Sequence, residues 1–161
     1  MFISYLLIMS KVKIPRLGAS PKASSKNVSK VMKANKASGT KIEVVFKDVL
    51  RREGLKNFTS NPKNVIGRPD IAFVKYSIAV FIHGCFWHHH VGCPRATIPK
   101  RNRSFWVGKF KENGARDRRK IRALREKGFS VFVIWECQTA REPKLKKFVE
   151  RVMAATKMAA E

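Results

Sequence analysis

Metal-ligating side chains are concentrated in one short segment of this chain. All four histidines and two of the three cysteines fall between His83 and Cys93. Imidazole and thiolate together favour zinc over magnesium or calcium. The apolar run at residues 78–82, directly before this segment, is typical of a buried strand. The sequence therefore predicts a zinc-binding loop that leaves the end of a strand.

A four-coordinate zinc site needs one ligand beyond the two cysteines and one histidine of this loop. Cys137 is the remaining cysteine, and it follows a predicted strand at residues 129–135. Because a strand end can lie beside the loop that leaves a neighbouring strand, a site with three cysteines and one histidine fits this inventory. The alternative is that Cys137 is a buried free thiol. A closed four-ligand site has no open position, so we expect this zinc to be structural.

Asp70 and His83 have the residue types and positions for a second kind of metal chemistry. Asp70 follows a tight turn at residues 67–69 and begins a strand, and His83 ends the next strand. Magnesium binds one or two carboxylates together with substrate phosphate. Histidine suits the base that activates water at neutral pH. The pair fits phosphodiester hydrolysis, whereas the structural alternative for Asp70 is a turn residue bonded to its own backbone.

Two other acidic residues have structural interpretations. Glu43 stands three residues after Thr40, which is the pattern of a helix capping box and a sufficient reason for its presence. Asp117 lies within an arginine-rich run, and we expect it to pair with neighbouring arginines on an exposed helix face. The sequence assigns Asp117 no role in chemistry.

The net charge of +24 restricts the class of partner. Neutralising phosphates releases condensed counterions, so a polyphosphate such as nucleic acid is the expected partner. A membrane surface is disfavoured because no long helix is apolar on one face and basic on the other. The apolar start, residues 1–9, is too short for a membrane span and is a poor signal peptide. Three cysteines cannot close into a disulfide framework, and two of them lie among histidines, so a reducing compartment and a cytoplasmic location are expected.

The chain is predicted to hold one α/β domain behind a basic arm. Residues 1–39 are expected to form a flexible N-terminal arm, and residues 40–161 the folded domain. The order of elements predicts a mixed β-sheet flanked by helices. In chain order, these elements are a helix at 40–52, hairpin strands at 70–74 and 77–82, a helix at 104–127, a buried central strand at 129–135 and a basic helix at about 144–158.

Five motifs occur in a fixed order along the chain. They are Gly-Arg-Pro-Asp at 67–70, His-Gly-Cys-Phe-Trp-His at 83–88, Phe-Trp at 105–106, Asn113 with Arg-Asp-Arg-Arg at 116–119, and Trp-Glu-Cys at 135–137. Together they resemble the Vsr family, the very-short-patch repair endonucleases, over roughly residues 25–141. The resemblance implies a restriction-endonuclease-like fold with a structural zinc. It also implies magnesium-dependent nicking of the thymine strand at T·G mismatches, which arise when 5-methylcytosine deaminates.

The resemblance further implies double-stranded DNA as the partner and a monomeric protein. It also suggests a functional link to a cytosine-5 methyltransferase, although the sequence does not show whether such a partner enzyme exists. In the catalytic site, Asp70 would bind magnesium through its carboxylate. Ile82, where a threonine is familiar, would bind it through its backbone carbonyl. His88 would activate water, and His83 and Glu43 would organise metal-bound waters.

The zinc ligands implied by the resemblance are Cys85, His90, Cys93 and Cys137. One residue more than expected separates His90 from Cys93, so His89 or His88 could replace His90. Replacement by His88 would also disturb the assignment of the base.

Aromatic and basic side chains are expected to contact the mismatch. By resemblance, Phe86, Trp87 and Trp106 wedge between base pairs, which costs least at a mispaired base. The alternative for Phe86 and Trp87 is core packing of the zinc loop. The other expected contacts are base edges for Lys109 and Asn113, phosphates for Arg116 and Arg119, and the minor groove for Val28 and Met32 of the arm.

Three rival functions are considered beside the mismatch endonuclease. A zinc-stapled DNA-binding module would not need Asp70 together with His88. The sequence does not clearly distinguish a mismatch endonuclease from a restriction-type endonuclease of different specificity. A zinc deaminase is disfavoured, because the chain lacks a Pro-Cys-x-x-Cys pair and a glutamate beside a histidine ligand.

Overall fold

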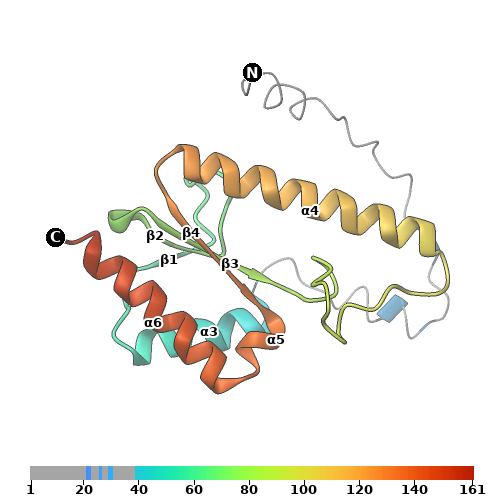
Figure 1. The fold of residues 1–161 in the computed structure, drawn as a ribbon, viewed down its shortest axis with the longest axis horizontal. Coiled ribbons are helices and arrows are strands. Elements are labelled where there is room, and N and C mark those ends of the chain that lie inside the picture. The colour runs from blue at the N-terminus through green and yellow to red at the C-terminus, as the bar shows by residue number, and fades with distance from the viewer. Residues whose placement is uncertain (1–20, 23–25, 27–28, 31–38) are drawn as a thin grey trace, which may run out of the picture.

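A computed structural model describes residues 21–22, 26, 29–30 and 39–161 of this chain (Figure 1). Most of the predicted arm, including Val28 and Met32, lies outside the described residues. No helix among the described residues is long and apolar enough to cross a membrane. In chain order, the elements are α3 (Lys41–Arg52), β1 (Thr59–Ser60), β2 (Ile71–Phe73), the 3-10 helix η1 (Val74–Tyr76), β3 (Ile78–His83), α4 (Arg103–Glu126), β4 (Ser130–Trp135), α5 (Glu136–Thr139) and α6 (Glu142–Met158).

The strands form one four-stranded mixed sheet in the order β1-β2-β3-β4. β2 and β3 pair antiparallel, which confirms the predicted hairpin, and β3 and β4 pair parallel with His83 opposite Trp135. The start of β2 therefore lies at the same end of the sheet as the ends of β3 and β4. This topology brings Asp70, His83 and Cys137 to one end of the sheet, although they are far apart in the sequence.

Helices cover both faces of the sheet (Figure 1). Alternate residues of β3 point to opposite faces, as expected for a strand. Ile78 and Val80 pack in a core cluster with residues of α3 and α6, while Ala79 and Phe81 pack in a second cluster with Leu124 of α4. The long helix α4 is thus fixed on one face of the sheet, and α3 with α6 on the other.

The prediction that the strand at residues 129–135 is central is wrong for the part of the chain that the structure describes. β4 pairs only with β3 in the sheet order and forms an edge. Its apolar residues do face both layers, since Phe132 packs in the cluster with α6 and Val133 in the cluster with α4. The unbroken apolar sequence of this strand therefore reflects helices on both faces of the sheet and does not indicate a central position in the sheet.

The predicted capping box at the start of α3 is confirmed. The Thr40 hydroxyl accepts from the Glu43 N–H at 3.3 Å, and the Glu43 carboxylate accepts from the N–H groups of Thr40 at 3.3 Å and Gly39 at 3.0 Å. These bonds satisfy amides that would otherwise lack partners at the helix end.

We expect Thr40→Ala to lower the free energy of unfolding by about 1 kcal/mol, because the cap acceptor is lost. Urea denaturation of the full chain measures this change. Thr40→Ser keeps the hydroxyl and is the matched control. An equal loss of stability in both variants would show that the hydroxyl is not the stabilising group.

A close contact between α4 and the turn before β2 fixes the position of Asp70. Gly67 has a φ of +76°, and a Cβ built there would lie 3.3 Å from both Cβ and the carbonyl oxygen of Lys120. Glycine is required by both the backbone conformation and the space. The turn that leads into Asp70 therefore packs against the long helix.

Candidate active site and metal centre

Asp70 lies half-buried at the start of β2, and its Oδ2 accepts a 2.7 Å hydrogen bond from the Ile82 N–H. The partner is thus across the hairpin and not in its own turn. Burial raises the pKa of Asp70 to about 6; the nearby Glu43 charge adds to this rise, while the Ile82 hydrogen bond, His88 and Lys120 oppose it. A carboxylate whose charge is disfavoured by burial is stabilised by a nearby cation. The donor chemistry of Asp70 therefore fits a divalent metal ion.

Glu43 contributes charge to this region without being free to move. Its side chain is only 4% exposed, and both carboxylate oxygens bind the backbone or hydroxyl groups of the α3 cap. Lys47 also lies 3.9 Å from its Oε2. The structural interpretation of Glu43 is therefore confirmed by its contacts, and its action on metal-bound water stays a prediction.

His83, His88 and Asp117 form a compact group at the end of β3. The rings of His83 and His88 stack with centroids 3.9 Å apart and planes 5° from parallel. Nδ1 of His88 lies 2.6 Å from Oδ2 of Asp117, a carboxylate on α4. His83 is 6% exposed, so the stack is enclosed on the side of the sheet.

The expectation for Asp117 is wrong. Its side chain is only 12% exposed and bonds to His88, in place of the arginines on either side of it. Burial opposes ionisation of Asp117, but the hydrogen bond from His88 and the charges of His88, His83 and Arg116 outweigh it and lower its pKa. Asp117 is therefore a carboxylate at neutral pH and can hold the His88 ring in one orientation.

The same three residues are not a good site for a metal ion. One ligand atom from each lies within 4.8 Å of the others. However, ring-nitrogen lone pairs lie in the ring planes, and two parallel stacked planes cannot both contain one ion. Burial and the charge of His88 lower the pKa of His83 to about 4, so this ring is neutral at pH 7; the stacked geometry, and not the protonation state, is what disfavours the metal. The geometry instead fits a carboxylate–imidazole pair whose Nε2 is the remaining ring nitrogen for proton transfer.

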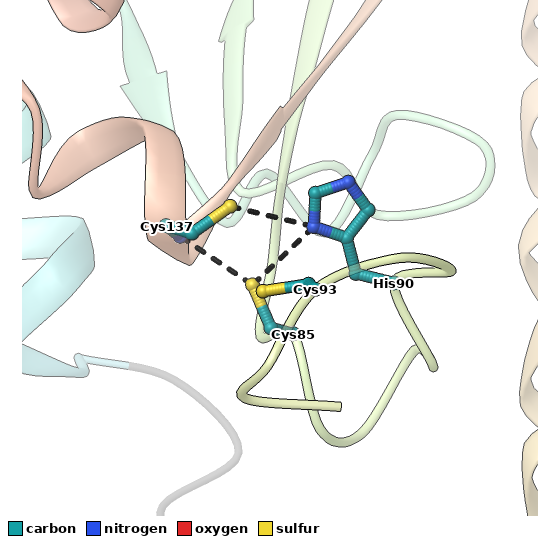
Figure 2. Close-up of side chains that lie close together, drawn as sticks. All are labelled: Cys85, His90, Cys93 and Cys137. Atoms are coloured by element: carbon teal, nitrogen blue, oxygen red, sulfur yellow. Dashed lines mark hydrogen bonds between the residues drawn. The ribbon is translucent and has the colours of Figure 1, made fainter. Parts of the chain in front are cut away.

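Cys85, His90, Cys93 and Cys137 form a second group that could hold a metal ion. Figure 2 shows these four side chains pointing toward one another, three from the loop after β3 and Cys137 from α5. Nδ1 of His90 lies 3.6 Å from Sγ of Cys85 and 3.4 Å from Sγ of Cys137. Tetrahedral zinc with bonds of 2.0–2.3 Å holds its ligand atoms about 3.5 Å apart. Both distances fit a zinc ion, and the ligand atoms of all four residues lie within 4.8 Å of one another.

Two further features support a cation in this cluster. Burial raises the pKa of the Cys85 thiol to about 12, so its thiolate needs a neighbouring positive charge. The Cys137 N–H donates to Sγ of Cys85 at 3.4 Å. His90 is the histidine of this group, and its ring stacks on Trp135 with centroids 4.1 Å apart. His88 and His89 are not part of the cluster, so no conflict arises between the metal centre and the His88–Asp117 pair.

Comparison with known proteins decides the family. The family model for the DNA mismatch endonuclease Vsr matches residues 22–95. The chain is 38% identical over 117 residues to the DNA mismatch endonuclease Vsr of Escherichia coli K12, covering 73% of this chain and 74% of that protein. It is 37% identical over 118 residues to the type II nicking enzyme V.NmeAIP of Neisseria meningitidis, covering 73% of this chain and 83% of that protein.

The chain belongs to the Vsr family of DNA mismatch endonucleases. The resemblance drawn from its five motifs is thereby confirmed. Another relative, the type II nicking enzyme V.XorIIP of Xanthomonas oryzae pv. oryzae, is 36% identical over 67% of this chain and 78% of its own length.

An aromatic cluster adjoins the group of His83, His88 and Asp117 in this Vsr-family protein. The ring centroid of Phe86 lies 5.2 Å from those of both Trp87 and Trp106 and 5.4 Å from that of Phe110. Phe86 and Trp87 are partly exposed, whereas Trp106 is only 7% exposed. The expectation that Trp106 inserts beside the other two does not match this burial. Trp106 packs as a support for the two rings of the loop.

The expected DNA-contacting face of α4 is divided. Asn113 is buried, and its Nδ2 donates to the backbone carbonyl of Trp87 at 2.7 Å, so its amide is not free to read a base edge. Its contact instead ties the aromatic loop to the helix. Lys109 is half-exposed and pairs with Glu112 at 2.7 Å. Arg116 and Arg119 are exposed, as a contact to phosphate requires.

Sequence reasoning missed Asp117 in this Vsr-family site, although a signal was present. Asp117 follows the polar residue Asn113 by four positions, and residues at that spacing share one helix face. Once Asn113 is placed beside the zinc loop, Asp117 must lie one turn further along the same face. The arginines on either side of Asp117 instead suggested an exposed helix face with local ion pairs.

Proposed function

We propose that this Vsr-family protein nicks the thymine-containing strand at T·G mismatches by magnesium-dependent hydrolysis. The observation that carries the proposal is the meeting of Asp70 with the His88–Asp117 pair. Asp70 precedes β2 and His88 follows β3, so the antiparallel pairing of these strands places both at one end of the sheet, where Asp117 bonds to His88. We also propose that the mixed sheet with its flanking helices is a variant of the restriction-endonuclease fold.

In this proposal, the Asp70 carboxylate and the backbone carbonyl of Ile82 would hold the magnesium ion. When bound, the ion supplies a Lewis acid that activates water and offsets charge on the phosphate. The Ile82 N–H already fixes Oδ2 of Asp70 at 2.7 Å, which orients the carboxylate. His88 accepts the proton of the attacking water at Nε2, and Asp117 at Nδ1 keeps that nitrogen available. His83 supports His88 by stacking, and Glu43 contributes negative charge to the same region.

Recognition of the mismatch is assigned to the aromatic loop. Phe86 and Trp87 are partly exposed and rest on the buried Trp106, which makes them rigid enough to enter a base step. Unstacking costs least at a pair that is already mispaired, and each aromatic–base stack returns roughly 1–3 kcal/mol. Arg116 and Arg119 are exposed on α4 and suited to phosphates.

The four-ligand cluster is proposed to bind a structural zinc ion. Its ligands Cys85 and His90 bracket the segment that carries Phe86, Trp87 and His88. A metal ion held there would thus position both the mismatch wedge and the catalytic base. A cytoplasmic location, a monomeric state and a link to cytosine-5 methylation are further parts of the proposal.

A strand-resolved nicking assay tests the function. Duplexes of one sequence carry T·G, each other mismatch or full pairing, with either strand labelled, with and without magnesium. We expect one nick, in the thymine strand of the T·G duplex, only with magnesium. Binding without any nick would favour the zinc-stapled DNA-binding module. Nicking of fully paired DNA at an equal rate would favour a restriction-type endonuclease.

We expect Asp117→Asn to lower kcat by about 10- to 1,000-fold, because the amide no longer fixes and stabilises the protonated His88 ring. The KM for the T·G duplex should stay within about threefold, since Asp117 is not exposed to DNA. Single-turnover kinetics separate these two quantities. The control Glu126→Gln lies on the same helix and pairs only with Arg122 at the surface. A loss confined to KM would argue against a positioning role for Asp117.

A further inference from the structure

A basic pocket opens beside the Cys/His cluster, and neither Phe86 nor Trp87 lines it. It has a volume of about 390 Å³, and its lining includes the side chains of Arg95, Arg141 and Lys144. His90, Cys93 and Cys137 also line it. Three cationic side chains from two separated segments thus converge on one cavity.

The charges of this pocket are mostly available to a ligand. Arg95 pairs with Glu136 at 3.5 Å, and Glu136 also accepts a hydrogen bond from the Cys85 N–H at 3.1 Å. The Glu136 carboxylate therefore links Arg95, at the edge of the pocket, to the backbone of the Cys/His cluster. Arg141 and Lys144 are exposed, and neither forms an ion pair with a residue that the structure describes. The pocket therefore carries a net positive charge and suits an anion.

The pocket lies one aromatic ring away from the catalytic group. Trp135 contacts His83 edge-on with ring centroids 5.3 Å apart, and it stacks on His90 at 4.1 Å. His90 is itself part of the pocket wall. Each DNA strand carries a phosphate about every 3.4 Å along the helix axis. In the proposal, a strand whose scissile phosphate is at Asp70 places a further phosphate at the pocket.

The positive surface continues from the pocket along α6. Lys147 and Arg151 follow Lys144 by three and seven positions, which places them on the same side of the helix. Arg151 lies over the ring of Phe132 at 5.8 Å, so this side of α6 runs beside the edge strand β4. Lys146 and Lys157 lie on a different side of the same helix, away from the pocket.

We propose that this pocket binds a backbone phosphate of the nicked DNA strand, at a position that flanks the nick. The site has a defined chemistry, a phosphodiester held by Arg141 and Lys144 at a rim braced by Arg95. It extends the DNA footprint beyond the aromatic loop and α4 to the start of α6. The proposal rests on the proposed function for its ligand, since it assigns a further contact of the same substrate.

The test compares two double variants with equal loss of charge. Arg141→Gln with Lys144→Gln removes the pocket cations, and Lys146→Gln with Lys157→Gln removes two exposed cations elsewhere on α6. Fluorescence anisotropy without magnesium measures the affinity of the full chain for a labelled T·G duplex at several salt concentrations. We expect the pocket variant to bind about tenfold more weakly, with a salt slope smaller by about 1, because one phosphate contact is lost. The control variant should change both quantities much less.

A methylphosphonate walk then locates the contact. Single uncharged linkages replace phosphates one at a time on either side of the nicked position. One flanking position should weaken binding of the wild type and of the control variant but have no further effect on the pocket variant. Equal losses in both double variants, or no position with this behaviour, would overturn the proposal. Nicking by the wild type is followed in parallel, so failure of the proposed function is recognised separately.

Discussion

Asp70→Asn is expected to abolish nicking, with a rate at least about a thousandfold lower, while affinity for a T·G duplex stays within about tenfold. The amide is nearly the same size as the carboxylate but is a poor magnesium ligand. Affinity should survive because the aromatic loop and the basic surface, which lie on other elements, supply most of the binding.

The Asp70→Asn variant should fold normally. Burial raises the pKa of Asp70 to about 6, above its ordinary 3.8, so the ionised form costs stability once the pH rises through this window. Replacing the charge with a neutral amide removes this cost at neutral pH. Thermal unfolding in the absence of magnesium should show a midpoint that is equal to or higher than that of the wild type.

Asp48→Asn is the matched control for charge. Asp48 is a half-exposed acid on α3 that pairs with Arg51 at the surface. Its substitution changes the net charge by the same amount and should leave nicking unaffected. Undiminished cutting by Asp70→Asn would remove Asp70 from the mechanism, whatever the control shows.

The second large effect is expected from the Cys/His cluster. Cys137→Ala should reduce bound zinc below one ion per chain and lower the unfolding midpoint by about 10 °C or more, because structural zinc supplies much of the stability of a loop with little core. Atomic absorption on protein purified without added metal measures the zinc content. Nicking should fall as well, since the loop carries His88.

His89 supplies the control for this experiment. It lies next to the ligand His90, yet its ring stacks on Phe110 and is not part of the cluster. We expect His89→Gln to retain one zinc per chain and His90→Gln to lose it. Full zinc content in Cys137→Ala, or loss through His89→Gln alone, would reject the proposed set of ligands.

The elements that position this site could be predicted from local sequence signals. Thr40 with Glu43 marks the start of α3, and the short link between two apolar runs marks the hairpin of β2 and β3. These signals depend on neighbours within a few residues. Cys137 is distant in sequence from the other cluster members and was predicted as a ligand because it is the remaining cysteine. Its side chain approaches Cys85 because β3 and β4 pair in parallel.

The contacts of α4 could not be predicted in the same way. The chain has 35 lysines and arginines, and a helix with basic residues around its whole circumference gives no pattern that distinguishes its buried side from its exposed side. The inward turn of Asn113 and Asp117 depends on how α4 crosses the zinc loop. That crossing is set by the aromatic packing of Trp106 and Phe110 against Phe86, a contact between segments distant in sequence.

The central claim is that one divalent cation is held by Asp70 while His88 acts as a base beside it. Crystals of the protein with a nicked T·G duplex, soaked in manganese, allow the ion to be located by anomalous scattering. We expect a single catalytic-site peak about 2.1 Å from an Asp70 carboxylate oxygen, with the His88 ring still bonded to Asp117 and facing the phosphate. A peak ligated by the nitrogens of His83 and His88, with none at Asp70, would contradict the claim.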